Sequence, residues 1–61
     1  MTDTEMHALR PGDIVQSLFD QTAYLVTANY GDHVTLTKTA EMTHAHEWRL
    51  LSKITHREDN A

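Results

Sequence analysis

The chain has 61 residues and a net charge of −4, from five Lys and Arg against nine Asp and Glu. Its hydrophobic fraction of 39% is too high for a disordered polar tract and suffices for one small core. Cysteine is absent, which excludes a disulfide framework and a thiolate metal site. One domain of marginal stability is expected, because a chain of about 60 residues buries only roughly 60% of the surface exposed in its unfolded form.

The charge and the apolar runs bear on the compartment and the partners. No stretch approaches the roughly 18 apolar residues that a membrane-spanning helix needs. The start, Met1-Thr-Asp-Thr-Glu, lacks the basic and apolar regions of a signal peptide. The sequence therefore predicts a cytoplasmic protein. A dominant phosphate-binding surface is not expected, because such a surface needs several clustered cations.

The first half of the chain reads as a polar arm followed by two strands. Residues 1–8 are mostly polar and show no hydrophobic periodicity, so they are predicted to be a flexible N-terminal arm. Pro11-Gly12-Asp13 signals a turn, and a short strand is expected from 14 to 19. Residues 23–29 are rich in β-forming residues and predict a central strand.

The second half predicts two further strands around one helical turn. Gly31 supplies the positive φ of a tight turn over 30–32. Apolar and polar residues alternate over 33–40, which is typical of a half-buried strand. Residues 41–47 break the alternation, and Thr43 can cap a single helical turn over 43–47. A last strand is expected over 48–54, followed by a flexible tail over 55–61.

These elements predict an all-β fold, and strands this short close most easily into a small barrel, which removes their edges. The segment Leu9-Arg-Pro-Gly-Asp-Ile-Val15 resembles the Gly-Asp-x-Val first-strand signature of the SH3-like barrels, which include the KOW and Tudor modules. The resemblance implies a barrel over 9–54 with four or five short antiparallel strands and one helical turn before the last strand. The expected core consists of Val15, Leu25, Val34, Leu36, Trp48, Leu50 and Ile54.

Catalytic and metal-binding patterns are weak. His44 and His46 form a His-x-His pair, but a zinc site needs three or four ligands and no second compact pair follows. Both serines lie inside predicted strands, and the two glycines are too far apart for a phosphate-binding loop. A barrel this small also lacks room for a ligand pocket of several hundred Å³. We therefore predict no enzyme activity, no metal and no cofactor.

Two surfaces are candidates for a partner. Tyr24, Val26 and Tyr30 share one face of the central strand with Ala28, and an exposed Tyr-bearing face suits a protein partner. The second candidate is a small basic patch, which would bind nucleic acid as KOW-like barrels do and consists of Arg10, Lys38, Arg49 and Lys53. The alternative role of Arg49 and Lys53 is to protect an edge strand against pairing with other chains.

The function predicted from these features is that of a small accessory or adaptor module, non-enzymatic, which binds a protein partner through a barrel face. The runner-up is a nucleic-acid-binding barrel that uses the basic patch. Short cysteine-free barrels of this kind resemble products of bacteriophages or mobile elements. A chain of this size without disulfide or metal also favours self-association, and a two-fold homodimer through the Tyr-bearing face is expected.

Overall fold

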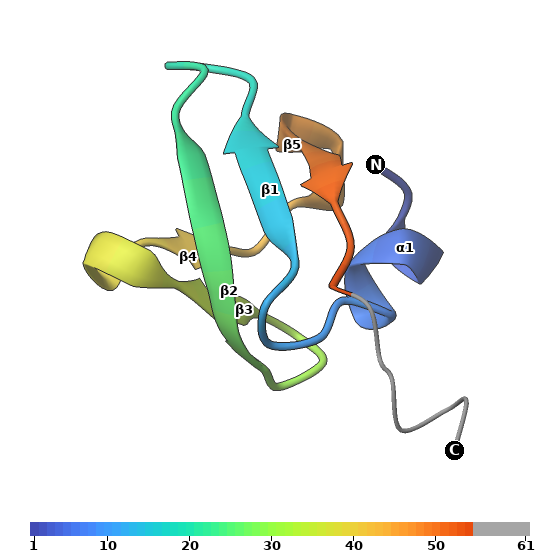
Figure 1. Cartoon of the computed structure of the whole chain (residues 1–61). Coiled ribbons are helices and arrows are strands. Elements are labelled where there is room, and N and C mark those ends of the chain that lie inside the picture. The colour runs from blue at the N-terminus through green and yellow to red at the C-terminus, as the bar shows by residue number, and fades with distance from the viewer. Residues whose placement is uncertain (55–61) are drawn as a thin grey trace.

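The fold is a five-stranded antiparallel sheet, seen in a computed structural model that describes residues 1–54 (Figure 1). The predicted tail over 55–61 lies outside the described residues. In the sheet the strands follow the order β4-β3-β2-β1-β5. Their bounds are Ile14–Ser17 for β1, Ala23–Asn29 for β2, Val34–Leu36 for β3, Glu41–Met42 for β4 and Trp48–Ser52 for β5. The all-β class is thus confirmed at the level of a curled antiparallel sheet.

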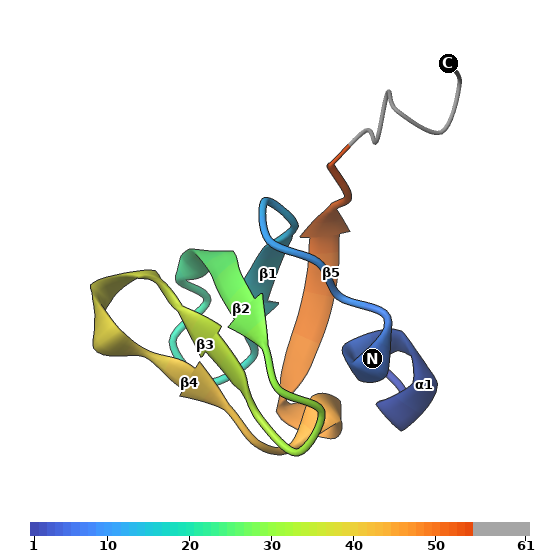
Figure 2. The same cartoon turned by 90° about the horizontal axis from the view of Figure 1, so that it is seen from below.

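The sheet curls because its ladders are irregular at two places. The register shifts between Ile14 and Val15 where β1 meets β5, and between Val26 and Ala28 where β2 meets β3. Such bulges bend a strand and increase its twist. Figure 2 shows the resulting half-barrel, with β5 and β4 on opposite sides of the concave interior.

The expected strand over 33–40 is shorter in the structure. β3 ends at Leu36, and a one-turn 3-10 helix, η1 (Thr37–Thr39), follows. Lys38 adopts a φ of 61°, and the amide of Leu36 donates to the Ala40 carbonyl at 2.9 Å, so the chain reverses. β4 then pairs back onto β3, a hairpin that strand alternation alone did not predict.

Other expected elements are confirmed. The central strand occupies the predicted residues 23–29, and Gly31 has a φ of 94° in the turn that follows it. A second 3-10 turn, η2 (Ala45–Glu47), occupies the predicted helical turn before the last strand. Figure 1 shows η2 leading directly into β5.

The core fills the concave side of the sheet. Val15, Val34, Leu36 and Trp48 are buried as predicted, and Leu50 packs against them. The remaining buried apolar residues are Met6, Leu9, Val26, Met42 and Ala45. Leu25 and Ile54 were wrongly placed in the core: each is 42% exposed.

The error at Leu25 is an inversion of the two faces of β2. Val15 pairs with Tyr24 and Ile14 with Leu25, so the buried Val15 fixes Tyr24 and Val26 on the inner face. Side chains alternate strictly along a strand, so Leu25 then points outward. Both faces of this strand are apolar in sequence, and composition therefore could not distinguish them.

The predicted flexible arm over 1–8 is instead ordered around a helix, α1 (Asp3–His7). Thr2 and Glu5 form a capping box: the Glu5 amide donates to Thr2 Oγ1 at 3.1 Å, and the Thr2 amide donates to Glu5 Oε1 at 2.8 Å. A helix this short is not stable by itself. It is held by Met6, which is buried in the core, and Figure 1 shows α1 lying beside β5.

Candidate interaction surface

A row of three aliphatic side chains crosses the outer face of β2, β1 and β5. Leu25 and Leu51 are 42% and 41% exposed, and Ile14 between them is half-buried. Ile14 is the direct cross-strand partner of Leu25 on β2 and of Ser52 on β5, and Leu51 is the extra residue of the bulge between Leu50 and Ser52. Neighbouring strands are about 4.8 Å apart, so Leu25 and Ile14 lie side by side, and the exposed Leu51 stands on the adjoining strand. We call these three residues the apolar strip.

The outer face of β1, β2 and β5 is the face of the sheet opposite the one that carries the buried Val15, Val26 and Trp48. We define it by its outward residues, which are Ile14, Gln16, Ala23, Leu25, Thr27, Arg49, Leu51 and Ser52. Its charged member is Arg49, which sits opposite Gln16. Beside Leu25 lies η1, because the Leu25 amide donates to Thr37 Oγ1 at 3.2 Å. The outer face is therefore apolar at its centre and carries cations on both flanks, Arg49 on β5 and the exposed Lys38 on η1.

The predicted partner-binding residues do not form one open surface. Val26 is 1% exposed and belongs to the core, so it is not available to a partner. Tyr24 is half-buried, with its ring edge-on to Trp48 at 5.6 Å between centroids. Tyr30 is exposed on the turn after β2, where it stacks on His33 at 4.9 Å. The Tyr-bearing face predicted as an interface is thus mostly the inner face of the sheet.

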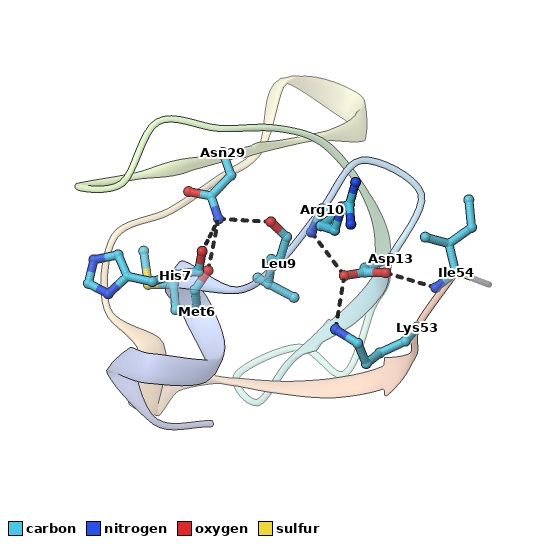
Figure 3. A network of polar contacts seen from close by, with 8 residues as sticks. All are labelled: Met6, His7, Leu9, Arg10, Asp13, Asn29, Lys53 and Ile54. Atoms are coloured by element: carbon cyan, nitrogen blue, oxygen red, sulfur yellow. Dashed lines mark hydrogen bonds and ion pairs between the residues drawn. The ribbon is translucent and has the colours of Figure 1, made fainter. Parts of the chain in front are cut away.

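The predicted basic residues fall in separate places. Asp13 accepts a hydrogen bond from the backbone amide of Arg10 and lies 3.6 Å from Lys53 Nζ, as Figure 3 shows. Arg49 belongs to β5 and Lys38 to η1, the turn between β3 and β4, and Figure 1 shows β5 and β4 on opposite sides of the sheet. The four residues therefore form no single basic patch in the structure, and Lys53 is paired with a carboxylate.

Asp13 is a buried carboxylate that joins the segment before β1 to the chain after β5 (Figure 3). Its Oδ2 accepts from the Arg10 amide at 2.9 Å, and its Oδ1 accepts from the Ile54 amide at 2.8 Å. Lys53 Nζ lies 3.6 Å from Oδ2. Burial by itself raises the pKa of this carboxyl, but the two amide donors and the Lys53 charge together hold its pKa below the ordinary 3.8.

A second exposed apolar element is the loop between β1 and β2. Phe19 is 78% exposed and Leu18 is 49% exposed. The loop is nevertheless well fixed: the Phe19 amide donates to Ser17 Oγ at 3.2 Å, and the Gln21 amide donates to the Ser17 carbonyl at 2.8 Å. The Leu18 amide donates to the Glu47 carbonyl at 3.0 Å, which ties the loop to η2. An acid, Asp20, follows the apolar pair.

Residues 1–54 contain no metal-binding cluster of side chains and no ligand pocket. No group of three or more His, Asp or Glu side chains is placed to hold a metal ion in this range. His44 and His46 lie edge-on at 5.8 Å between ring centroids, and each is exposed. The same residues enclose no pocket. Within that range, no helix has the length and apolar character to cross a membrane.

Comparison with protein-family models, with curated proteins and with solved structures finds no match to this chain. The candidate surface therefore rests on its own geometry. Sequence reasoning missed the row on the outer face, because it assigned Leu25 to the core. The signal that was present is the Leu50-Leu51 pair in the last strand, because adjacent residues of a regular strand point to opposite faces of the sheet.

Proposed function

We propose that this protein is a small non-enzymatic accessory module that binds a protein partner through the outer face of its sheet. The observation that carries the proposal is the exposure of Leu25 and Leu51, with the half-buried Ile14 paired to Leu25, on strands whose inner face already forms the core. An exposed, contiguous apolar strip with a polar rim is typical of protein interaction sites.

The fold to which we assign the chain is the SH3-like small barrel. Three features support this: the order β4-β3-β2-β1-β5, the return of the last strand to pair with the first, and the 3-10 turn before that strand. Asp13 of the Gly-Asp-x-Val motif has a structural role that fits the assignment, because its carboxylate fastens the chain after β5 to the start of β1. A fold by itself does not define a function, so the proposal rests on the outer face.

The test is cross-linking and affinity capture with the full chain from an extract of the cells that encode it. We compare the wild type with Leu25→Gln and Leu51→Gln, which keep the charge and remove the apolar strip. Tyr30→Gln is the matched control, because Tyr30 is exposed but lies on the turn after β2. We expect a protein that is enriched on the wild type and on the control and is lost on both leucine variants.

Two outcomes would contradict the proposal. One is that no protein is enriched on the wild type over the leucine variants, although circular dichroism shows all four chains folded. The other is binding of an oligonucleotide with a steep salt dependence, abolished by loss of Arg49, which would favour the nucleic-acid-binding alternative. That alternative has less support, because Lys38 stands apart from the other cations and Asp13 offsets the charge of Lys53.

A further inference from the structure

We infer that the outer face receives an acidic segment that also carries apolar side chains. This inference rests on the proposed function and names the chemistry of the partner. It follows from the distribution of charge around the strip of Leu25, Ile14 and Leu51, which differs from that of the chain as a whole.

The chain has nine acidic residues and five basic ones, yet the outer face of β1, β2 and β5 carries no acid among its described outward residues. Among the described strand residues the acid is Glu41 on β4, two strands away from β2, and Asp20 lies in the loop that joins β1 to β2. Arg49 and Lys38 stand at opposite flanks of the strip. Within residues 1–54 neither of these cations has a carboxylate within 4.0 Å.

Opposite charges at the rim of an apolar contact guide a partner and exclude competitors. A partner with leucine-like side chains facing the strip and carboxylates at either side would match both the apolar centre of this face and the cations at its flanks. A basic partner would meet like charge at both flanks. The preference is expected to weaken with salt, because Arg49 and Lys38 are exposed and their fields are screened over about 10 Å at 0.1 M salt.

A second copy of the chain is a poorer match. A two-fold axis across the strip places the β5 flank of one copy against the η1 flank of the other, so that Arg49 opposes Lys38. An axis along the strip places each flank against itself, so that Arg49 opposes Arg49 and Lys38 opposes Lys38. Like charges face each other in both arrangements and disfavour the complex, so a different protein is a better match than the homodimer expected from chain length.

Nucleic acid also matches the strip less well. Single strands are held by aromatic side chains on which bases stack. The described outward residues of β1, β2 and β5 are aliphatic or polar, and the nearest exposed aromatic rings lie on the loop before β2 and on the turn after it. The centre of the face is suited to aliphatic side chains.

The experiment uses two labelled peptides of equal length as probes, one alternating Leu with Glu and the other alternating Leu with Lys. Fluorescence anisotropy is recorded with the full chain at low salt and at ~0.3 M salt, where screening is stronger. We expect the acidic peptide to bind and the basic peptide to bind at least about five-fold more weakly, in line with the modest energy of exposed ion pairs. The difference should shrink at the higher salt.

Three variants separate the contributions. Leu25→Gln should abolish binding of the acidic peptide, and Arg49→Glu should weaken it by about five-fold and remove the preference, because the new acid offsets Lys38 on the other flank. Arg10→Glu is the matched control for charge, because it changes the net charge equally but lies before β1, away from the strip. It should leave the affinity for the acidic peptide unchanged within about two-fold.

The inference is overturned if the acidic peptide does not bind, if both peptides bind equally, or if Arg10→Glu has the same effect as Arg49→Glu. Sedimentation that shows a dimer lost in Leu25→Gln would overturn it in favour of a second copy. These results leave the proposed function standing if a natural protein is still captured in a Leu25-dependent way. Failure of the proposed function is distinct, since it is the absence of any Leu25-dependent partner.

Discussion

The side-chain amide of Asn29 donates to the backbone carbonyl of Met6 at 3.0 Å, from the end of β2 to the end of α1 (Figure 3). The same Nδ2 lies 3.0 Å from the Leu9 carbonyl and 3.2 Å from that of His7. The last carbonyls of a helix have no partner within the helix, and Asn29 supplies one. One side chain thus fastens the N-terminal segment to the sheet and closes that end of the core.

Replacement of Asn29 should therefore loosen α1 and destabilise the fold. Asn29→Ala removes the side-chain donor shared by the carbonyls of Met6, His7 and Leu9, at an expected cost of about 1–3 kcal/mol in the free energy of unfolding. Urea denaturation followed by Trp48 fluorescence measures the loss. Thr4→Ala, an exposed change in the same helix, should alter stability by no more than about 0.5 kcal/mol. Equal stability of the two variants would show that Asn29 does not hold the helix.

The helix α1 shows that local features can be predicted from the sequence, whereas long-range contacts cannot. Thr2 and Glu5 carry the spacing of a capping box, so the start of α1 was readable from the chain. What holds the helix is a contact with Asn29, more than twenty residues away, and local patterns contain no information about it. The central strand and the Gly31 turn are local features, and both were predicted.

The candidate surface was predicted less well for a physical reason. Alternation shows that Leu25 and Val26 face opposite ways, but it does not say which of them faces the core. That choice depends on the pairing of Val15 with Tyr24, which is a property of the assembled sheet. When both faces of a strand are apolar, the sequence of that strand alone does not determine which face is turned to the core. The pairing with the neighbouring strands determines it.

A pair of adjacent substitutions on β2 tests this assignment of faces. Val26→Ser places a hydroxyl in a fully packed core and should destabilise the protein strongly, enough to unfold a domain of this size. Leu25→Ser changes a residue on the outer face and should leave the protein folded, with a loss of about 1 kcal/mol or less. Thermal melts by circular dichroism compare the two. If Leu25→Ser is the less stable variant, Leu25 and not Val26 faces the core, as the sequence predicts.

The carboxylate of Asp13 should make stability depend on pH in the acid range. Its pKa in the folded protein lies below the ordinary 3.8, because the Ile54 and Arg10 amides and Lys53 outweigh the effect of burial. A lowered folded pKa contributes stability that is complete above about pH 4 and is lost as the pH falls through the folded pKa. The pKa values of the exposed Asp20 and Asp32 are lowered as well, by hydrogen bonds and by His33 respectively.

Urea denaturation between about pH 6 and pH 2 measures this dependence. Asp13→Asn should be less stable than the wild type at pH 6, because an amide accepts through one oxygen where the carboxylate accepts through two. It should also lose less stability on acidification. Glu41→Gln, an exposed change on β4, is the control and should follow the wild-type profile. A wild type whose stability is constant from pH 6 to pH 2 would contradict the role assigned to Asp13.

Gly12 provides a last test, at the turn that precedes β1. Its φ is +104°, which side-chain-bearing residues rarely adopt, and a Cβ there would lie 2.5 Å from Ile54 Cδ1. Gly12→Ala should therefore cost about 1–3 kcal/mol from backbone strain, with a further loss from the clash. Ile54→Ala removes the clashing atoms, so the double variant should recover the second part and retain the first. A double-mutant cycle by urea denaturation measures the coupling. If Gly12→Ala is as stable as the wild type, the chain after β5 does not pack over this turn as the structure shows.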